Sequence, residues 1–129
     1  MPRSAYACDL CPLHQEAISV CMGATTPMKP LFAVIAEAPG AEEDKEGLPL
    51  IGPSGRLLWS ELERHGLSRD QAFVTNVVKC RPPNNRTPKQ SEIRACSWFL
   101  AGELDWLEDV GCKYILALGG TAYKQLGGT

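Results

Sequence analysis

The chain has 129 residues, 44% of them hydrophobic, and a formal net charge of −2. This length predicts a single domain over residues 1–129 and is too short for two comfortable domains. The charge excludes a uniformly basic nucleic-acid binder of the histone kind, although it is compatible with a local basic patch. The sequence has no apolar run long enough to cross a membrane, and its first residues lack the apolar core of a signal peptide, so we expect a cytoplasmic protein.

A cysteine pair marks the N-terminal arm, about residues 1–25, as a metal-binding segment. Cys8 and Cys11 are separated by two residues, which lets two thiolates from one turn reach a single metal. Cytoplasmic cysteines are normally reduced and therefore available as ligands. If Cys80 and Cys96 converge on this pair, the four thiolates can hold zinc or an iron–sulfur cluster, because thiolate ligands alone do not separate the two. Taken alone, Cys96 fits a core position equally well.

Three short segments are predicted as strands. They are rich in β-branched and apolar residues and are bounded by turn formers, as strands buried on both faces of a parallel sheet should be: residues 31–36, 72–78 and 113–119. The segments between them have helical patterns. Because strands alternate with helices, we expect an α/β fold in which a parallel sheet is covered by helices.

The two predicted helices have clear start and stop signals. Ser54-Gly55 begins the first and Gly66 ends it, with a shared apolar face formed by Leu57, Leu58 and Leu62. Pro88 begins the second, and Gly111 ends it. Its apolar stripe at helical spacing consists of Ile93, Cys96, Leu100, Leu104 and Leu107.

An acidic loop follows the first predicted strand. The chain continues there as Glu37-Ala38-Pro39-Gly40 and then gathers three further carboxylates, at Glu42, Glu43 and Asp44. Open α/β sheets bind their ligands at the carboxyl ends of strands, so we expect this long irregular loop to form a site. The alternative is a solvated turn in which water keeps the carboxylates apart.

A second group of polar residues follows the second predicted strand. Asn76 lies near the end of that strand, and its amide offers both donors and an acceptor, which suits the edge of a nucleobase. A loop broken by prolines comes next and carries a compact basic patch, formed by Lys79, Arg81, Arg86 and Lys89. Such a patch indicates phosphate contacts, and the alternative is a solvated loop whose charges serve only solubility.

These motifs together resemble the family 4 uracil-DNA glycosylases, the iron–sulfur members of the uracil-DNA glycosylase superfamily. The resemblance rests on AEAPGAEEDKEGLPLIGPSG at 36–55, on TNVVKCRPPNNRTP at 75–88 and on the cysteines at 8, 11, 80 and 96. The closing YILALGGTAYKQLGG at 114–128 is similar to the third strand and following helix of the family. The resemblance covers nearly the whole chain in order and implies a three-layer αβα sandwich.

The resemblance also implies roles for individual residues. The four cysteines would hold a [4Fe–4S] cluster that is mainly structural, with zinc as the alternative. Glu37 would position the hydrolytic water, and Asn76 would read the edge of the extruded uracil. The uracil pocket would further be lined by Ala38, Pro39, Gly40, Asp44 and Leu50. DNA phosphates would be gripped by Ser54, Gly55, Lys79, Arg81 and Arg86.

Two features of this sequence differ from the pattern of that family. Leu50 stands where the family has an aromatic residue that stacks on uracil, so base binding should lose stacking worth about 1–3 kcal/mol. The family continues with a fourth strand and a His-Pro-Ser loop, whereas this sequence stops at residue 129. We therefore expect a weak or partner-dependent glycosylase, or else a non-catalytic module that binds DNA or protein. The third strand should present an open edge that a partner chain could complete.

Overall fold

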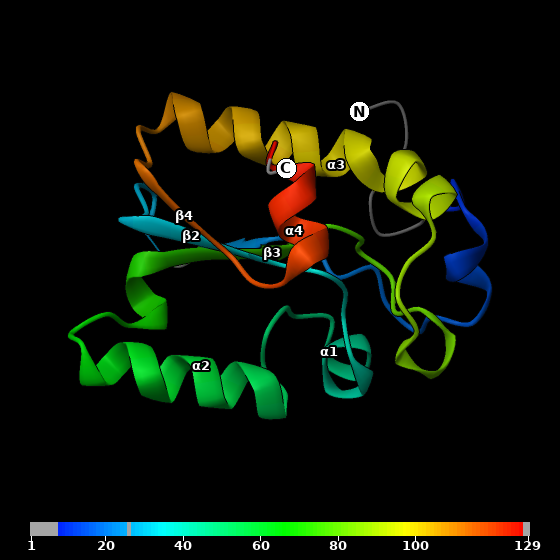
Figure 1. The fold of residues 1–129 in the computed structure, drawn as a ribbon, viewed down its shortest axis with the longest axis horizontal. Helices are drawn as coiled ribbons and strands as arrows, with labels where there is room; N and C mark the ends of the chain where they lie inside the picture. Colours follow the sequence, from blue (N-terminus) through cyan, green and yellow to red (C-terminus); the bar gives the residue numbers. More distant parts are fainter. Residues whose placement is uncertain (1–7, 26, 128–129) are drawn as a thin grey trace.

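The computed structural model describes residues 8–25 and 27–127, which form one sheet flanked by helices (Figure 1). Its strands are β1 (Ala24–Thr25), β2 (Phe32–Ala36), β3 (Ala72–Asn76) and β4 (Tyr114–Ala117). Its α-helices are α1 (Ala41–Glu46), α2 (Pro53–Arg64), α3 (Gln90–Asp109) and α4 (Gly120–Gln125). Short 3-10 turns occupy Pro12–Gln15, Arg69–Gln71 and Pro83–Asn85.

The sheet has the strand order β1-β3-β2-β4 and is mixed. β2 lies at its centre and pairs in parallel with β3 and with β4, so that Val34 is opposite both Val74 and Leu116. The three predicted strands thus form a parallel sheet as expected, and β1, which the sequence did not predict, adds an antiparallel strand at one edge. This strand comes from the N-terminal arm and is only two residues long, too short to leave a hydrophobic pattern in the sequence.

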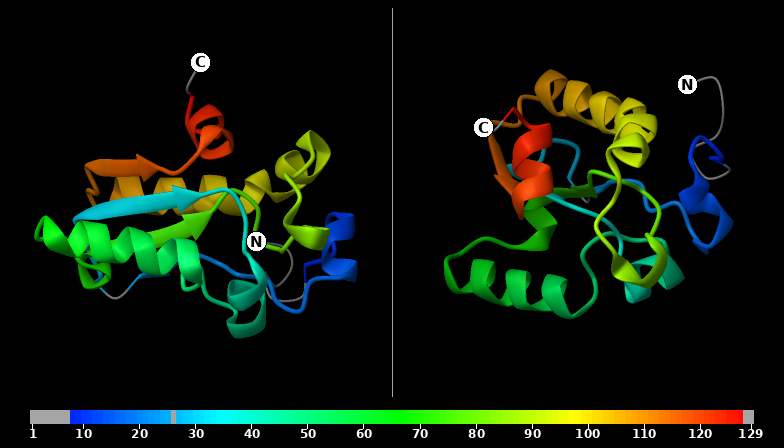
Figure 2. Two further views of the ribbon diagram at one scale, coloured as in Figure 1. Left: turned by 60° about the horizontal axis from the view of Figure 1, so that its bottom comes forward. Right: turned by 45° about the vertical axis from the view of Figure 1, so that its right-hand side comes forward.

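Successive side chains of a strand point to opposite faces of the sheet, so a hydrophobic core forms on each face. Phe32, Val34 and Ala36 point toward α2 and pack with Leu50 and Trp59. The intervening residues of β2 point to the opposite face, where α3 and α4 contribute buried side chains. Each fully buried aliphatic or aromatic side chain of this kind contributes about 1.5–3 kcal/mol to folding. The result is helix, sheet and helix in three layers, as expected (Figures 1 and 2).

The helices differ from their predicted forms in detail. Leu57 is 67% exposed, so the expected apolar face of α2 is wrong at this position, and Trp59 is the large residue that α2 buries. The stripe of α3 holds better: Ile93, Leu100 and Leu107 are buried, and Cys96 and Leu104 are half-buried. Within the described residues, no helix is both long enough and apolar enough to span a bilayer.

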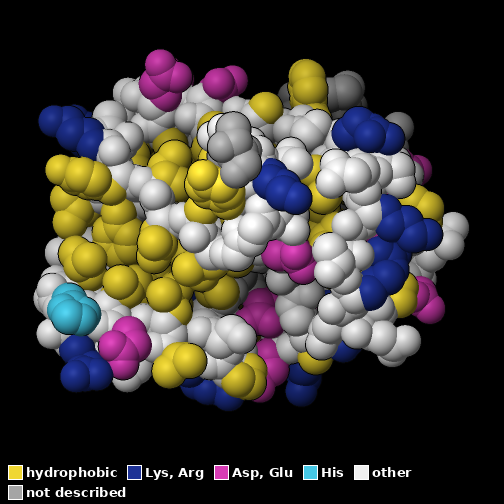
Figure 3. Space-filling model, viewed as in Figure 1, with side chains coloured by type: hydrophobic (Ala, Val, Ile, Leu, Met, Phe, Trp, Pro, Cys, Tyr) yellow, Lys and Arg dark blue, Asp and Glu magenta, His cyan; other side chains and the backbone are white. Residues whose placement is uncertain are grey.

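Among the residues that the structure describes, β4 has a pairing strand on one side only, so it is an open edge of the sheet, as predicted from the sequence. Tyr114, Ile115 and Leu116 are all exposed to a substantial degree, although strands of this composition are normally covered. Figure 3 shows hydrophobic side chains gathered over this side of the molecule. They line a groove of about 470 Å³, formed by Leu31, Phe32, Leu62, Leu67, Tyr114, Ile115 and Leu116.

Candidate active site

A pocket opens where β2 and β3 end side by side. Ala36 pairs with Asn76 at the last position of the two strands, and the pairing continues beyond them, since the N–H groups of Val77 and Val78 donate to the carbonyls of Ala36 and Glu37. The pocket has a volume of about 440 Å³. It is lined by Ala38, Gly40, Ala41, Glu42, Glu43, Leu50, Gly52, Pro53, Ser54, Asn76 and Asn85. The structure thus brings together five residues predicted from the sequence: Ala38, Gly40, Leu50, Ser54 and Asn76.

The side chain of Asn76 is the unusual polar group of this pocket. It is 1% exposed, and neither its Nδ2 nor its Oδ1 has a hydrogen-bond partner within the part of the chain that the structure describes. A buried polar group without a partner costs about 1–3 kcal/mol, and most buried groups in proteins avoid that cost. The amide is therefore free to donate to, and accept from, a planar ligand edge that enters the pocket.

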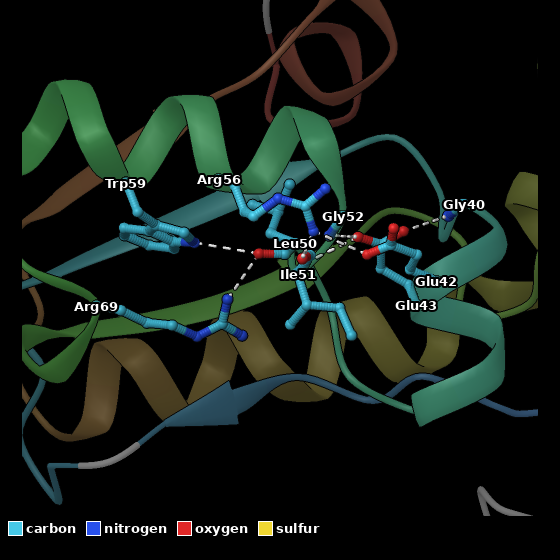
Figure 4. A network of polar contacts seen from close by, with 9 residues as sticks. All are labelled: Gly40, Glu42, Glu43, Leu50, Ile51, Gly52, Arg56, Trp59 and Arg69. Carbon is cyan, nitrogen blue, oxygen red and sulfur yellow. Dashed lines mark hydrogen bonds and ion pairs between the residues drawn. The ribbon is translucent and has the colours of Figure 1, made fainter.

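Glu43 closes the acidic loop into a fixed shape (Figure 4). Its Oε1 accepts a hydrogen bond from the N–H of Gly40 at 3.0 Å, and its Oε2 accepts from the N–H groups of Ile51 at 2.8 Å and of Gly52. Burial opposes the charge on this carboxylate, but the bonds from backbone N–H groups prevail and hold the pKa of Glu43 below its ordinary value. The carboxylate of Glu43 thus bonds both ends of the loop, at Gly40 and at Ile51 and Gly52.

The sequence gives Glu43 no predicted role of its own in the site and predicts an irregular loop for this segment. The structure corrects this, because residues after Gly40 form the helix α1. The signal in the sequence was the spacing of Gly40 and Glu43, in which a residue at the helix N-cap is followed three positions later by glutamate. The alternative of a solvated acidic turn is also wrong, since Glu43 and Asp44 are buried.

Leu50 is held in the pocket wall by a network that sequence reasoning also missed. Its backbone has a φ of 51°, a left-handed conformation that costs a β-carbon residue about 1–2 kcal/mol. Its carbonyl accepts hydrogen bonds from Trp59 Nε1 at 3.1 Å and from Arg69 Nη1 at 2.8 Å. Arg69 also donates to the carbonyl of Pro49 and lies over the Trp59 ring, as Figure 4 shows in part. These contacts offset the strain and fix Leu50.

Three residues predicted in the acidic loop lie elsewhere than the pocket wall. Glu37 is half-buried at the end of β2, and its Oε2 accepts a hydrogen bond from Thr121 Oγ1 of α4 at 2.7 Å. Pro39 is fully buried. Asp44 is 2% exposed and accepts from the N–H groups of Ile18 and Ser19, so it fastens the N-terminal arm. Asp44 therefore lies outside the pocket that contains Asn76 and lines a separate cavity together with Glu16 and Arg81.

The residues predicted to contact DNA divide into exposed and buried ones. Ser54 is exposed in the first turn of α2, and Arg81 and Arg86 are half-exposed in the loop after β3. Arg86 forms a bidentate ion pair with Glu92 at 2.8 Å. Lys79 is only 1% exposed and forms an ion pair inside the protein, so its predicted phosphate contact is wrong. Gly55 is also buried, against the backbone of Leu50.

The four cysteines predicted as ligands line a single small cavity. Cys8, Cys11, Cys80 and Cys96 face it together with apolar residues, among them Leu13, Val20 and Phe99. Burial raises the pKa of Cys80 to about 12 and that of Cys96 to about 11, and neighbouring thiols add to both shifts. Among the described residues, no three Cys, His, Asp or Glu side chains already stand at metal-binding geometry. Four thiols converging in an apolar cavity nevertheless fit a tetrathiolate group, either zinc or iron–sulfur.

Comparison with known proteins places this architecture in a family. The model of the family described as uracil DNA glycosylase superfamily matches residues 22–129. The chain belongs to the uracil-DNA glycosylase superfamily. It is 44% identical over 119 residues to a protein of Pyrobaculum aerophilum named type-4 uracil-DNA glycosylase, covering 92% of this chain and 59% of that protein. The resemblance seen in the sequence is thereby confirmed.

Two further relatives bear the same name. The type-4 uracil-DNA glycosylase of Sulfurisphaera tokodaii is 44% identical over 125 residues, covering 96% of this chain and 55% of that protein. The corresponding protein of Thermotoga maritima is 42% identical over 115 residues, covering 89% of this chain and 58% of that protein. The chain therefore spans a little more than half the length of these three relatives.

Gly55→Ala should destabilise the protein by about 3 kcal/mol, because a β-carbon at this position would overlap the carbonyl of Leu50. Gly102→Ala is the matched control, since Gly102 lies in α3 with nothing within 4 Å of an added β-carbon. The control should stabilise the protein by about 0.5–1 kcal/mol. Urea unfolding of both variants measures the difference. Equal stabilities would contradict the close approach of Gly55 to Leu50.

Glu43→Gln should cost about 1–3 kcal/mol, because one amide side chain cannot accept all the bonds that the carboxylate accepts. The pKa of Glu43 is lowered in the folded state, so its stabilising contribution is complete above the unfolded pKa. That contribution is lost as the pH falls below about 5 through the lowered folded pKa, and the variant should lack this part of the acid dependence.

Glu42→Gln is the control for Glu43→Gln, because Glu42 is exposed and contacts only Arg56 among the hydrogen bonds and ion pairs that the structure gives it. The comparison is between the melting temperatures of the two variants, measured at intervals of about one pH unit from about pH 3 to about pH 7. An acid limb unchanged by Glu43→Gln would show that the loop is held by other contacts.

Proposed function

We propose that this chain carries the uracil pocket of a DNA repair enzyme that hydrolyses the N-glycosidic bond of uracil in DNA. The observation that carries the proposal is the buried amide of Asn76, which has no partner within the described residues and lies in the pocket between β2 and β3. Membership of the superfamily and the names of the type-4 relatives support the same activity. Those names give no support to the alternative of a non-catalytic module.

Extrusion of the nucleotide would bring the base into this pocket. The Nδ2 group of Asn76 would donate to a carbonyl oxygen of uracil, and its Oδ1 would accept the N–H between the two carbonyls. Leu50 would cover the ring with an apolar side chain fixed by Trp59 and Arg69. Because an aliphatic wall lacks the stacking of an aromatic one, we expect weak base binding and slow turnover.

Water activation would fall to Glu37, with the backbone of residues 38–40 beside it. Its carboxylate lies at the end of β2 and is oriented by the hydroxyl of Thr121. From there it would hold a water molecule for attack on the sugar carbon as the bond to uracil breaks. The departing base carries negative charge, which hydrogen bonds from Asn76 and from loop N–H groups would stabilise.

DNA phosphates would contact the rim of the pocket. Ser54 lies in the first turn of α2, where free N–H groups attract anions. Arg81 and Arg86 border the loop after β3, and the position of Arg86 is fixed by its bonds to Glu92. The rates of uracil release from single-stranded and from duplex DNA, measured in the assay below, decide which substrate is preferred.

Cys8, Cys11, Cys80 and Cys96 would hold a [4Fe–4S] cluster, with zinc as the alternative. Such a group supplies structural cross-linking rather than a step of the hydrolysis. It would tie the N-terminal arm to the loop after β3 and to α3. All six cysteines are free, which suits the reducing cytoplasm as the place where the protein works.

A protein segment that completes the sheet is the partner that we propose besides DNA. The exposed edge of β4 offers unpaired backbone groups, and the apolar groove beside it offers space for side chains. The relatives extend well beyond the part that this chain spans. Residues supplied by such a segment would complete the active site.

Uracil release from an oligonucleotide with one deoxyuridine tests the proposed activity. The unaltered protein, purified without oxygen, should produce abasic sites on single-stranded or duplex substrate. Glu37→Gln and Asn76→Ala should each lower the rate by about 100-fold or more, because each removes a group at the reacting centre. Glu42→Gln, which changes an exposed carboxylate on the pocket rim, is the matched control. Equal rates in all four proteins would contradict the proposed roles.

Metal content tests the proposed cysteine site. The protein should be brown and contain about four iron atoms per chain, whereas a zinc site would be colourless. Cys96→Ser should remove both colour and iron and lower the thermal stability, while Cys112→Ser, a change outside the cavity, should leave them intact. Full iron content in Cys96→Ser would contradict the assignment of that ligand.

A further inference from the structure

Lys79 is a buried cation that the proposed chemistry does not use. Its side chain is 1% exposed, whereas lysine is almost never fully buried unless its charge is paired. The Nζ group donates three hydrogen bonds: to Thr75 Oγ1 at 2.7 Å, to the backbone carbonyl of Asn76 and to Glu103 Oε1. All three donors of the ammonium group are thus engaged at the end of β3.

Glu103 connects this ammonium group to two other parts of the molecule. It belongs to α3, and its Oε1 accepts from Thr75 Oγ1 as well as from Lys79. Its Oε2 accepts from the backbone N–H of Gly23, just before β1, at 2.7 Å. One ion pair therefore joins α3, the N-terminal arm and the strand that ends in Asn76.

The alternation of β3 places this ion pair on the opposite face of the sheet from the pocket. Thr75 shares its face with Phe73, which packs on the α3 side, and the Asn76 side chain lines the pocket on the other side. Because the Asn76 amide has no hydrogen-bond partner among the residues that the structure describes, its position depends on the backbone that carries it. Lys79 bonds that backbone directly, at the Asn76 carbonyl.

The segment after Asn76 is fixed on the cysteine side as well. The backbone N–H of Lys79 donates to Cys96 Sγ at 3.3 Å, and its carbonyl accepts from the N–H of Cys21 at 2.7 Å. The side chain and backbone of Lys79 thus link the base-reading strand to the cysteine cavity and to the arm.

We propose that the Lys79–Glu103 pair is a positioning clamp that sets the direction of the Asn76 amide, an inference that rests on the proposed function of the pocket. The clamp bonds the backbone carbonyl of Asn76 on the α3 side of the sheet. The side-chain amide of Asn76, on the pocket side, is thereby oriented to form hydrogen bonds with the edge of uracil. A misplacement of about 1 Å at such a group is enough to cost about 100-fold in rate. Lys79 and Glu103 are positioning residues and touch no substrate.

The test removes both charges at once, as Lys79→Met with Glu103→Gln, because loss of one partner alone would leave an uncompensated buried charge. The matched control is Arg64→Met with Glu61→Gln, which removes an ion pair within α2 without touching Asn76 or a proposed DNA contact. Both double variants are made in the unaltered protein and in Asn76→Ala, and kcat and KM for uracil release are measured.

The clamp variant should lower kcat/KM by about 10–100-fold in the presence of Asn76, and it should do so through the same change, a lower kcat or a higher KM, that Asn76→Ala produces. In the Asn76→Ala background it should change kcat/KM by less than about 2-fold, because residues that act through one another are not additive. The control should have the same effect in both backgrounds. Equal losses from the clamp variant in both backgrounds would overturn the proposal and leave a purely structural ion pair.

Hydrogen exchange separates failure of the clamp from failure of the proposed function. The amides of Val77 and Val78, bonded to the carbonyls of Ala36 and Glu37, should exchange faster in the clamp variant than in the control. If the unaltered protein releases no uracil, the proposed function fails, and equal exchange in the two double variants then overturns the clamp as well. If the clamp variant does not fold, Thr75→Val, which removes the hydroxyl shared by Lys79 and Glu103, should give a smaller change in the same direction.

Discussion

The hydrogen bonds that the Glu43 carboxylate accepts from the backbone hold the pocket together. They join Gly40, at the start of α1, to Ile51 and Gly52, at the start of α2. Without them, a loop of more than ten residues would have to be ordered by weaker contacts against its conformational entropy, about 1–2 kcal/mol for each residue. With them, the loop has one closed shape, and Leu50 is carried into the pocket wall.

The sheet divides the chemistry of the molecule between its two faces. The pocket lies on the side of α1 and α2, and the four cysteines lie on the side of α3, where Leu13, Ile93 and Leu100 form a shared core. The end of β3 is common to both sides, because Asn76 faces the pocket while Cys80 faces the cysteine cavity. A group bound by the cysteines would therefore support the pocket by ordering the strand end from behind.

The sequence predicted the central parts of this fold because burial on both faces leaves a strong pattern. The three predicted strands recur as β2, β3 and β4, shifted by at most two residues at their ends, and Asn76 lies at the end of its strand as expected. The convergence of the four cysteines on one cavity was also predicted, although their spacing alone left a core role for Cys96 open.

Other features depend on tertiary contacts that no local pattern reports. A lysine in a basic loop is expected to be exposed to solvent. Lys79 is buried because it pairs with Glu103, which is far from it in the sequence and belongs to α3. Asp44 reads as one more acid of the loop, yet it bonds the backbone of the arm at Ile18 and Ser19. The two-residue strand β1 pairs only because the arm returns to the sheet edge.

Within the described residues the buried amide of Asn76 has no partner, and the proposed function requires this amide to bind the edge of uracil. Calorimetric titration of free uracil into the unaltered protein and into Asn76→Ala tests this claim most directly, with melting temperatures measured beside it. We expect uracil to bind the unaltered protein and Asn76→Ala to weaken binding by about 10-fold or more, since two hydrogen bonds are lost while the fold persists. Equal binding by the two proteins would contradict this claim.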